Sequence, residues 1–535
     1  MVKTPSLLRS MLSFSAMTFV SRILGLVRDQ VINAAFGVNW MTDAFWVAFR
    51  IPNFMRRLFA EGSFSTAFVP VFTEVKEKRS HAELKALVAR TSGTLGGVLL
   101  VVAALGMLGS DVITALFSPG AIAQPEKFRL TSNLLRITFP YLLFVSLTAL
   151  AGGALNSFHK FALPALTPVI LNLCMIAGAL WLAPHMAVPI AALAWSIFAA
   201  GIVQLLFQFP SLHRLDLLAL PRWGWSHPEV RRILRLMIPT LFGSSIAQVN
   251  LLLDTLIASL LITGSQTWLQ QTDRLLELPL GVFGVALGSV ILPSLSRHHV
   301  STDRAGFSSA IDWGLRTALL ISVPAMLGLV LLARPIIATL FQHGLFTAHD
   351  ADMTALSLTA LSFGLPAFAL VKVLAPAFYA RQDTKSPVRA GVAAMAANMI
   401  LNIVFVGILF AFWRRPDDLA DGWLAAIARV PGLHMGLALA SALASYLNLW
   451  LLWRALQREG VYVRMPGWNA HLLRLGAASL ALVVMLLIGL VVWPEWSGLP
   501  TATRVWRLGA LIAGASAAFS VVLVASGFRL RDLRG

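Results

Sequence analysis

The stretch "FALPALTPVILNLCMIAGALWLAP" covers residues 161–184 and contains no charged side chain. It exceeds the ~20 residues that a helix needs to cross a ~30 Å hydrocarbon core. Uncharged runs of similar length recur at 91–110, 137–158, 186–212, 390–413 and 475–494. Of the 535 residues, 58% are hydrophobic and only 12% are charged. A soluble domain is about 25% charged, so the sequence predicts a polytopic membrane protein.

Helices are the expected secondary structure, because only helices and closed barrels satisfy the backbone in lipid, and no alternating barrel strands are seen. The predicted class is all-α, with about fourteen transmembrane helices. The expected ranges are 11–36, 40–72, 84–110, 130–158, 161–184, 186–211, 229–262, 268–297, 309–334, 353–380, 386–413, 432–453, 471–494 and 504–528. The single cysteine, Cys174, excludes an intrachain disulfide.

The net charge of +18 follows from where the basic residues fall along the chain. With the N-terminus placed inside, the inner loops and adjoining helix ends hold 26 Lys and Arg, against 8 on the outer side. Cytoplasmic loops carry such an excess, so both termini are predicted to lie in the cytoplasm. Nucleic-acid binding is the weaker interpretation, because the charges are scattered and no recognisable binding fold is present.

A weak internal repeat relates two parts of the chain. "VITALFSPG" (112–120) resembles "IIATLFQHG" (336–344), and "VRDQVINA" (27–34) resembles "LLDTLIAS" (252–259). The spacing predicts two parallel six-helix copies around a central cavity, which is a transporter layout. The predicted parts are an N-terminal lobe at 1–225, a C-terminal lobe at 226–457 and two further helices at 458–535.

Several charges fall at the centres of expected helices. Arg22 and Arg56 lie near the middle of the first and second helices, and Arg28 follows in "SRILGLVRDQ" (21–30) beside Asp29. A charge at the bilayer centre costs at least ~2.5–3.5 kcal/mol on insertion scales. Because basic residues outnumber acidic ones here, we expect a hydrated cationic cavity that receives an anion. Arg136 is expected to reach the interface instead.

The second half carries "TDRLLELP" at residues 272–279. Asp273 and Glu277 are one turn apart, an unfavourable like-charge pair unless a cation such as Arg274 lies between them. We interpret this cluster as a gate or a ligand site.

A separate polar set consists of Asn250 and Asp254 in the seventh expected helix and of Asn398 and Asn402 in the eleventh. Carboxylate and amide oxygens suit a hard cation such as Na⁺. Hydrogen bonding between helices is the commoner role of such residues.

Longer motifs carry a family resemblance. "TDAFWVAFRIPNFMRRLFAEGSFSTAFVPVF" (42–72), "SRILGLVRD" (21–29), "TDRLLELPLGVFGVALGSVILPSLSR" (272–297) and "VLAPAFYARQDTKSPV" (373–388) resemble the MurJ (MviN) lipid II flippases. That family is related to the multidrug MATE exporters. The resemblance implies two six-helix lobes, and two final helices that form a groove opening to the membrane.

The resemblance also implies function and site residues. Such a protein moves lipid II, the undecaprenyl-pyrophosphate-linked peptidoglycan precursor, from the inner to the outer leaflet of the bacterial inner membrane. Membrane lipids and cell-wall synthesis proteins are further candidate partners, and Na⁺ or the membrane potential is a candidate driving force without any other cofactor. Matching positions are Ser21, Arg22, Arg28, Asp43, Asn53, Arg56, Arg274 and Glu277 for substrate and gate, and Asp254, Asn398 and Asn402 for Na⁺.

Two other classes stay open at this point. A MATE-like exporter of cationic drugs predicts a cavity dominated by carboxylates, which the basic surplus argues against. A membrane enzyme acting on polyprenyl phosphates needs clustered carboxylates at a membrane face, for which "RRPDDLAD" (414–421) is the candidate. The chain has no Walker motif, so an ATPase is not expected.

Overall fold

The computed structural model describes the backbone of residues 7–57, 64–301, 303–414 and 422–529. Side chains are described for the same residues except 7–19, 64–66, 238–247, 282–290, 292, 299–300 and 424. All regular elements of these residues are helices, as the apolar runs predicted. They form two compact units, 1–266 and 267–535. The lobe boundaries expected from the repeat remain a prediction.

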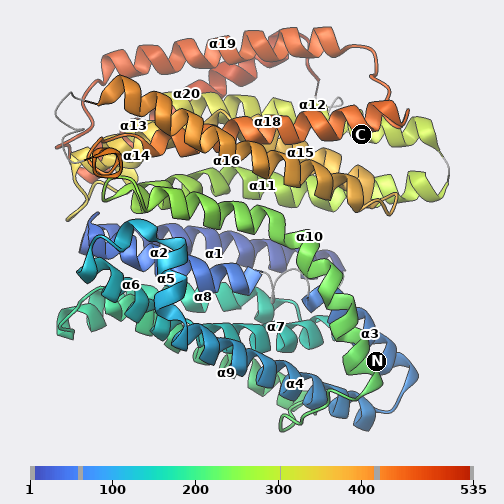
Figure 1. Cartoon of the computed structure of the whole chain (residues 1–535). Coiled ribbons are helices and arrows are strands. Elements are labelled where there is room, and N and C mark those ends of the chain that lie inside the picture. The colour runs from blue at the N-terminus through green and yellow to red at the C-terminus, as the bar shows by residue number, and fades with distance from the viewer. Residues whose placement is uncertain (1–6, 58–63, 302, 415–421, 530–535) are drawn as a thin grey trace. The chain divides into compact units, whose positions relative to one another are not determined.

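The first unit contains the ten helices labelled first along the chain in Figure 1. They are α1 (Leu7–Phe36), α2 (Trp40–Arg56), α3 (Phe64–Lys78), α4 (His81–Leu108), α5 (Ser110–Phe117), α6 (Pro125–Thr138), α7 (Tyr141–Ser157), α8 (Ala162–Ala177), α9 (Ala191–Arg214) and α10 (Pro228–Ala258). The helix expected at 40–72 coincides with α2 and α3, on either side of residues 58–63, which lie outside the described residues. Large aromatic side chains on α2, including Trp46, fill one core of this unit.

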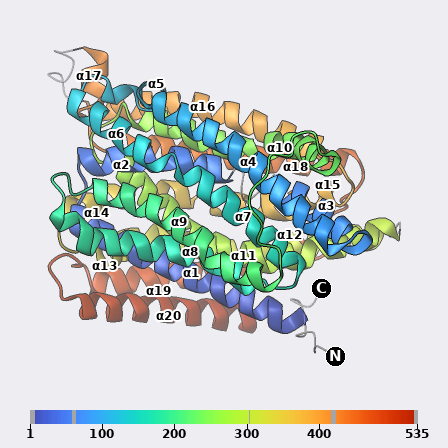
Figure 2. The same cartoon turned by 90° about the horizontal axis from the view of Figure 1, so that it is seen from below.

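The second unit begins within α11 (Ser265–Val300). It continues with α12 (Arg304–Leu331), α13 (Ala333–Leu340), α14 (Ala348–Ser362), α15 (Leu365–Tyr379), α16 (Lys385–Trp413), α17 (Trp423–Ile427), α18 (His434–Arg458), α19 (Trp468–Val492) and α20 (Thr501–Ala525). Figure 2 shows α19 and α20 side by side, and α19 also packs against α12. The two helices expected outside the repeat are therefore attached to this unit.

The helix boundaries display the repeat. The first residues of α5, α6, α7 and α8 precede those of α13, α14, α15 and α16 by 223 or 224 residues. The eight-residue helices α5 and α13 lie where the apolar pattern predicts loops, so that prediction is wrong. Both are strongly amphipathic and too short to cross a membrane, which explains why a search for long apolar runs misses them.

Several expected boundaries need correction, and local chemistry explains them. α4 begins at His81 rather than 84, because Ser80 and Glu83 form a capping box. α14 begins at Ala348 rather than 353, because Thr347 and Asp350 form another.

One expected helix is bent in the structure. The expected 353–380 helix consists of α14 and α15, which meet at a 42° bend just before Pro366. The expected 130–158 helix is confirmed as one span, Pro125–Ser157, in which α6 and α7 adjoin at Pro140. Proline removes a backbone donor and clashes with the preceding turn.

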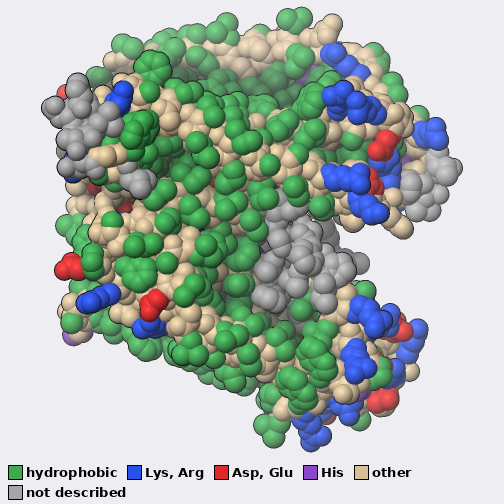
Figure 3. Space-filling model, viewed as in Figure 1, with side chains coloured by type: hydrophobic (Ala, Val, Ile, Leu, Met, Phe, Trp, Pro, Cys, Tyr) green, Lys and Arg blue, Asp and Glu red, His purple; other side chains and the backbone are tan. Residues whose placement is uncertain are grey.

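The surface and helix lengths fit a bilayer. Among the described residues, nine helices are long and apolar enough to cross a membrane, and the bent pair α14–α15 makes a tenth. The other four expected segments include residues without described side chains, so the count of fourteen remains a prediction. On the face shown in Figure 3, hydrophobic side chains cover the middle of each unit, and Lys and Arg gather toward its ends.

Close packing on α4 gives a stability prediction. A Cβ added at Gly93 would lie 2.3 Å from the backbone oxygen of Arg222, whereas one at Gly96 would meet its nearest atom at 3.9 Å. The Arg222 segment is anchored there by its N–H, which donates to the carbonyl of Ala89 at 2.8 Å. Gly93→Ala is therefore expected to destabilise the protein by about 1–3 kcal/mol, measured by thermal unfolding in detergent.

Gly96→Ala is the matched control on the same helix. It is expected to leave the melting temperature unchanged or to raise it, because alanine is the better helix former. Equal melting temperatures for the two variants would contradict the packing shown for Gly93.

Candidate functional site

The predicted charged residues of α1 form a buried network. The side chain of Arg28 is paired with Asp29, with 2.5 Å between Nη2 and Oδ1, and the two residues are only 6% and 1% exposed. Nη1 of Arg28 also donates to Oδ1 of Asn172 on α8, at 3.1 Å. The amide of Asn172 donates in turn to the backbone carbonyl of Ser21, at 3.2 Å. This network ties α1 to α8 and fixes the Arg28 guanidinium in one orientation.

Arg22 lies on the same helix but in a different setting. It is half-buried, whereas Arg28 is buried. Six residues separate the two, which corresponds to about 120° around an ideal helix. Ser21, beside Arg22, contributes its backbone oxygen to the network described above. The sequence analysis did not identify Asn172, because nothing near it in the sequence indicates a partnership with α1.

A second group of arginines lies on α2. Nε of Arg56 donates to Oδ1 of Asn53 at 3.0 Å, so two of the predicted substrate residues are in contact. Both are half-buried, at the last turn of the helix. Arg50, one and a half turns earlier, is buried and donates to the hydroxyl of Thr255 on α10 at 2.7 Å. The sequence around Arg50 gives no sign of this contact, because Thr255 lies 205 positions further along the chain.

Asp43 lies in the first turn of α2, and the side chain is buried. Its Oδ2 accepts a hydrogen bond from the N–H of Gly264 at 2.7 Å. The same oxygen lies 3.8 Å from Nζ of Lys127 on α6. Sequence reasoning had placed Lys127 in an outer loop, but it is buried and belongs to a helix. Asp43 therefore connects three segments, and Lys127 is a partner that sequence spacing could not reveal.

The charged cluster of α11 lies in the second unit. Arg274 pairs with Glu277 across one turn, at 3.4 Å between Nη1 and Oε2, and Asp273 precedes this pair. All three side chains are half-buried. Arg274 was expected to lie between Asp273 and Glu277, and the structure shows it in an ion pair with Glu277. Nearby, Nζ of Lys372 donates to the carbonyl of Leu280 at 3.2 Å.

The predicted cation ligands are divided between the units. Asp254 on α10 accepts a hydrogen bond from Asn250 one turn earlier, at 3.3 Å. Asn398 and Asn402 form part of the buried face of α16. The hydroxyl of Ser441 on α18 donates to Oδ1 of Asn398 at 3.4 Å. Amide, hydroxyl and carboxylate oxygens are suitable ligands for a hard cation. Ser441 is a further oxygen donor, and it lies on the twelfth expected helix.

Among the described residues, no group of three or more His, Cys, Asp or Glu side chains could hold a metal ion. Most of the acidic segment 414–421, considered for an enzyme, lies outside the described residues.

Repeated helices, a broken span and buried charges on membrane helices define a polytopic membrane protein of the transporter type. The chain belongs to the lipid II flippase MurJ family, whose model matches residues 32–501. A probable lipid II flippase MurJ of Vibrio cholerae is 44% identical, over 99% of this chain and 98% of its own length. The lipid II flippase MurJ of Burkholderia cenocepacia is 38% identical, over 99% of both chains.

Solved structures agree with this assignment. A lipid II flippase MurJ in an inward closed conformation matches with a TM-score of 0.75 and 27% identity, over 96% of this chain and 99% of its own. An inward-facing MATE transporter of the MOP superfamily matches with a TM-score of 0.64 and 12% identity, over 84% of this chain and 98% of its own. The second likeness shows a shared fold.

The different burial of Arg22 and Arg28 gives a testable contrast. Removing one partner of a buried ion pair leaves an uncompensated charge, which costs about 3–5 kcal/mol. Arg28→Gln is therefore expected to lower the melting temperature of the purified protein clearly more than Arg22→Gln does. Thermal unfolding in the same detergent measures both variants, and an equal loss in the two would contradict a structural role for the Arg28–Asp29 pair.

Proposed function

We propose that this chain is a lipid II flippase that carries the peptidoglycan precursor from the inner to the outer leaflet. The observation that carries the proposal is a set of buried and half-buried arginines, on membrane helices of a chain that matches the MurJ family over residues 32–501. The precursor keeps its covalent structure, so the protein is a transporter and not an enzyme. Alternating access to the two leaflets is the proposed cycle.

The arginines suit the pyrophosphate of this substrate. A guanidinium binds phosphate oxygens through two parallel hydrogen bonds, which a lysine cannot reproduce. In the first unit, Asn53 orients Arg56, and Asp29 with Asn172 orients Arg28. Fixed donors lose little conformational entropy when the ligand arrives. We propose Ser21, Arg22, Arg28, Asn53, Arg56 and Arg274 as substrate-binding residues.

The acidic partners have a different proposed role. Glu277 holds Arg274 in the second unit, and Asp43 holds Gly264 and Lys127 in the first. A substrate phosphate competes with a carboxylate for the same guanidinium, so binding would exchange one ion pair for another. We therefore propose Asp29, Asp43, Asp273 and Glu277 as gate or charge-pair residues. An exporter of cations would need the opposite balance of charge.

The proposed location is the bacterial inner membrane, with both termini in the cytoplasm. This orientation is supported by the excess of basic residues in alternate loops, according to the positive-inside rule. The proposed partners are lipid II, the surrounding lipids and the cell-wall synthesis proteins that use the delivered precursor.

A bound Na⁺ is a proposed source of bias in the cycle. The residues that we propose as its ligands are Asp254, Asn398 and Asn402. An ion shifts a conformational equilibrium only by its differential affinity for the two states. Because the ligands are distinct from the proposed phosphate-binding arginines, the ion need not compete with the substrate.

Arginine replacement tests the proposed function. Arg22→Ala, Arg28→Ala, Arg56→Ala and Arg274→Ala are each expected to abolish growth of a strain depleted of its own flippase, although the protein still inserts. The corresponding lysine variants should restore growth only in part, because lysine keeps the charge but not the two-pronged geometry. Complementation and membrane abundance are measured together.

Arg136→Ala is the control for that experiment. Arg136 pairs with Asp111 at 3.0 Å, and both side chains are largely exposed, so growth should be preserved. Full growth with all four of the other alanine variants would contradict an arginine-held pyrophosphate.

The cation proposal has a separate test. Asp254→Ala is expected to lower transport and to remove its dependence on Na⁺, while lipid II binding stays largely intact. Both proteins are measured in Na⁺ and in K⁺. Identical transport by wild type and variant in both salts would show that Asp254 has no coupling role.

A further inference from the structure

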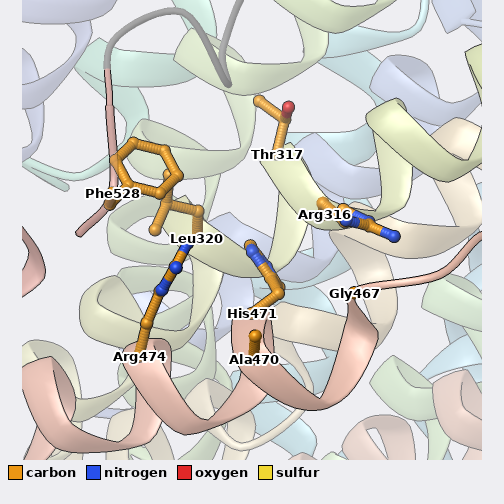
Figure 4. Close-up of a pocket in the computed structure, with 8 residues that line it drawn as sticks. All are labelled: Arg316, Thr317, Leu320, Gly467, Ala470, His471, Arg474 and Phe528. Carbon is orange, nitrogen blue, oxygen red and sulfur yellow. The ribbon is translucent and has the colours of Figure 1, made fainter. Parts of the chain in front are cut away.

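A pocket of about 400 Å³ lies within the second unit, between α12, α19 and the residues that follow α20. Its lining includes the polar side chains of Arg316, Thr317, His471 and Arg474 and the apolar side chains of Leu320 and Phe528. In Figure 4, His471 and Arg474 extend from α19 toward α12, and Arg474 points toward Leu320 and Phe528. No acidic residue is among the residues that line the pocket.

Arg316 is held firmly at one side of this pocket. Its Nε lies 2.7 Å from Oδ2 of Asp312, and its Nη2 donates to the carbonyl of Pro466 at 2.8 Å. Asp312 is itself buried and accepts hydrogen bonds from the hydroxyl of Tyr462 and from the indole of Trp468. Burial raises the pKa of the Tyr462 hydroxyl, and its hydrogen bond to Asp312 raises it further. Arg316 is thus a structural cation that also lines the pocket.

Two further polar groups of the pocket, the Arg474 guanidinium and Nε2 of His471, have no side-chain partner among the described residues. Among the residues that the structure describes, Arg474 forms no ion pair or hydrogen bond. Nε2 of His471 is buried and has no hydrogen-bond partner within the same set. A buried polar group without a partner is costly, so such groups usually mark a bound water, ion or ligand. Among the described residues, the guanidinium of Arg474 therefore brings to the pocket a positive charge with which no carboxylate pairs.

The pocket lies at the polar end of three apolar helices. Arg316 is followed by the uncharged residues 317–333, and Arg474 is followed by 475–494. The last uncharged run of the chain, 508–528, ends at the pocket residue Phe528. Leu320 and Phe528 belong to an apolar cluster that continues from the pocket along these helices. Lys and Arg at the end of an apolar helix typically lie at the level of the lipid headgroups, so we place the pocket at that depth.

We propose that this pocket binds the phosphate of an anionic glycerophospholipid. Arg474 and Arg316 would contact the phosphate oxygens, and Leu320 and Phe528 would contact the first carbons of the acyl chains. Basic pockets between membrane helices are typical sites for such headgroups. A free phosphate ion shares the charge but cannot use the apolar side of the pocket. The proposal is independent of lipid II transport, because none of these residues belongs to the proposed substrate site.

Native mass spectrometry of the full-length, delipidated protein tests this assignment. The protein is titrated in neutral detergent with dioleoyl phosphatidylglycerol, and the dissociation constant of the first bound lipid is measured. Arg474→Gln is expected to weaken this binding about tenfold, which corresponds to about 1.4 kcal/mol. Arg474→Lys should give an intermediate value. Ala470→Trp, which fills the pocket and keeps every charge, should also weaken binding.

The matched control is Arg454→Gln on α18. Arg454 stacks over the ring of Trp450 at 4.9 Å and does not line the pocket, so phosphatidylglycerol binding should be unchanged. Phosphatidylcholine has the same phosphate but also a positively charged choline, so it should bind wild-type protein more weakly than phosphatidylglycerol does. An unchanged thermal unfolding midpoint in the same detergent shows that Arg474→Gln is folded. Equal binding by the Arg474 and Arg454 variants would overturn the proposal. Displacement of phosphatidylglycerol by an equal concentration of inorganic phosphate would overturn its assignment to a lipid.

Discussion

The ion pair between Arg28 and Asp29 is the interaction on which the first unit of this protein depends. An arginine in the middle of a membrane helix is tolerated only with a counter-charge or with water. Asp29 supplies that counter-charge from the next position on the chain, and Asn172 extends the contact to α8. The cost of the buried charge is offset locally, and the guanidinium stays oriented. Arg28 can therefore remain charged inside α1, where a transporter of anions requires a cation.

The same principle recurs around the candidate site, with different partners. Arg56 is oriented by an amide, Arg50 by a hydroxyl and Arg274 by a carboxylate. Amide and hydroxyl partners orient a guanidinium without adding negative charge, whereas the carboxylates of Asp29 and Glu277 also add a counter-charge. Replacing a single arginine therefore changes both the charge of the site and the packing of its helices.

Much of the fold followed from the sequence, because membrane helices are long, apolar and separated by polar loops. The repeat was also visible, and the positions of α5 and α13 agree with it. The bend before Pro366 was missed, since apolar composition continues across it. The partners of the charged residues were the least predictable part. Lys127 lies 84 positions from Asp43 and Asn172 lies 144 from Arg28, so only the folded chain brings them together.

The central claim is that arginines of this chain carry lipid II across the bilayer. The most direct measurement places the purified protein in liposomes with lipid II, and follows the fraction of lipid II that an external reagent can reach. The account predicts that wild-type protein exchanges the lipid between leaflets, and that Arg28→Ala protein, reconstituted to the same amount, does not. Equal exchange by the two proteins, or exchange by wild-type protein no faster than in empty liposomes, would contradict it.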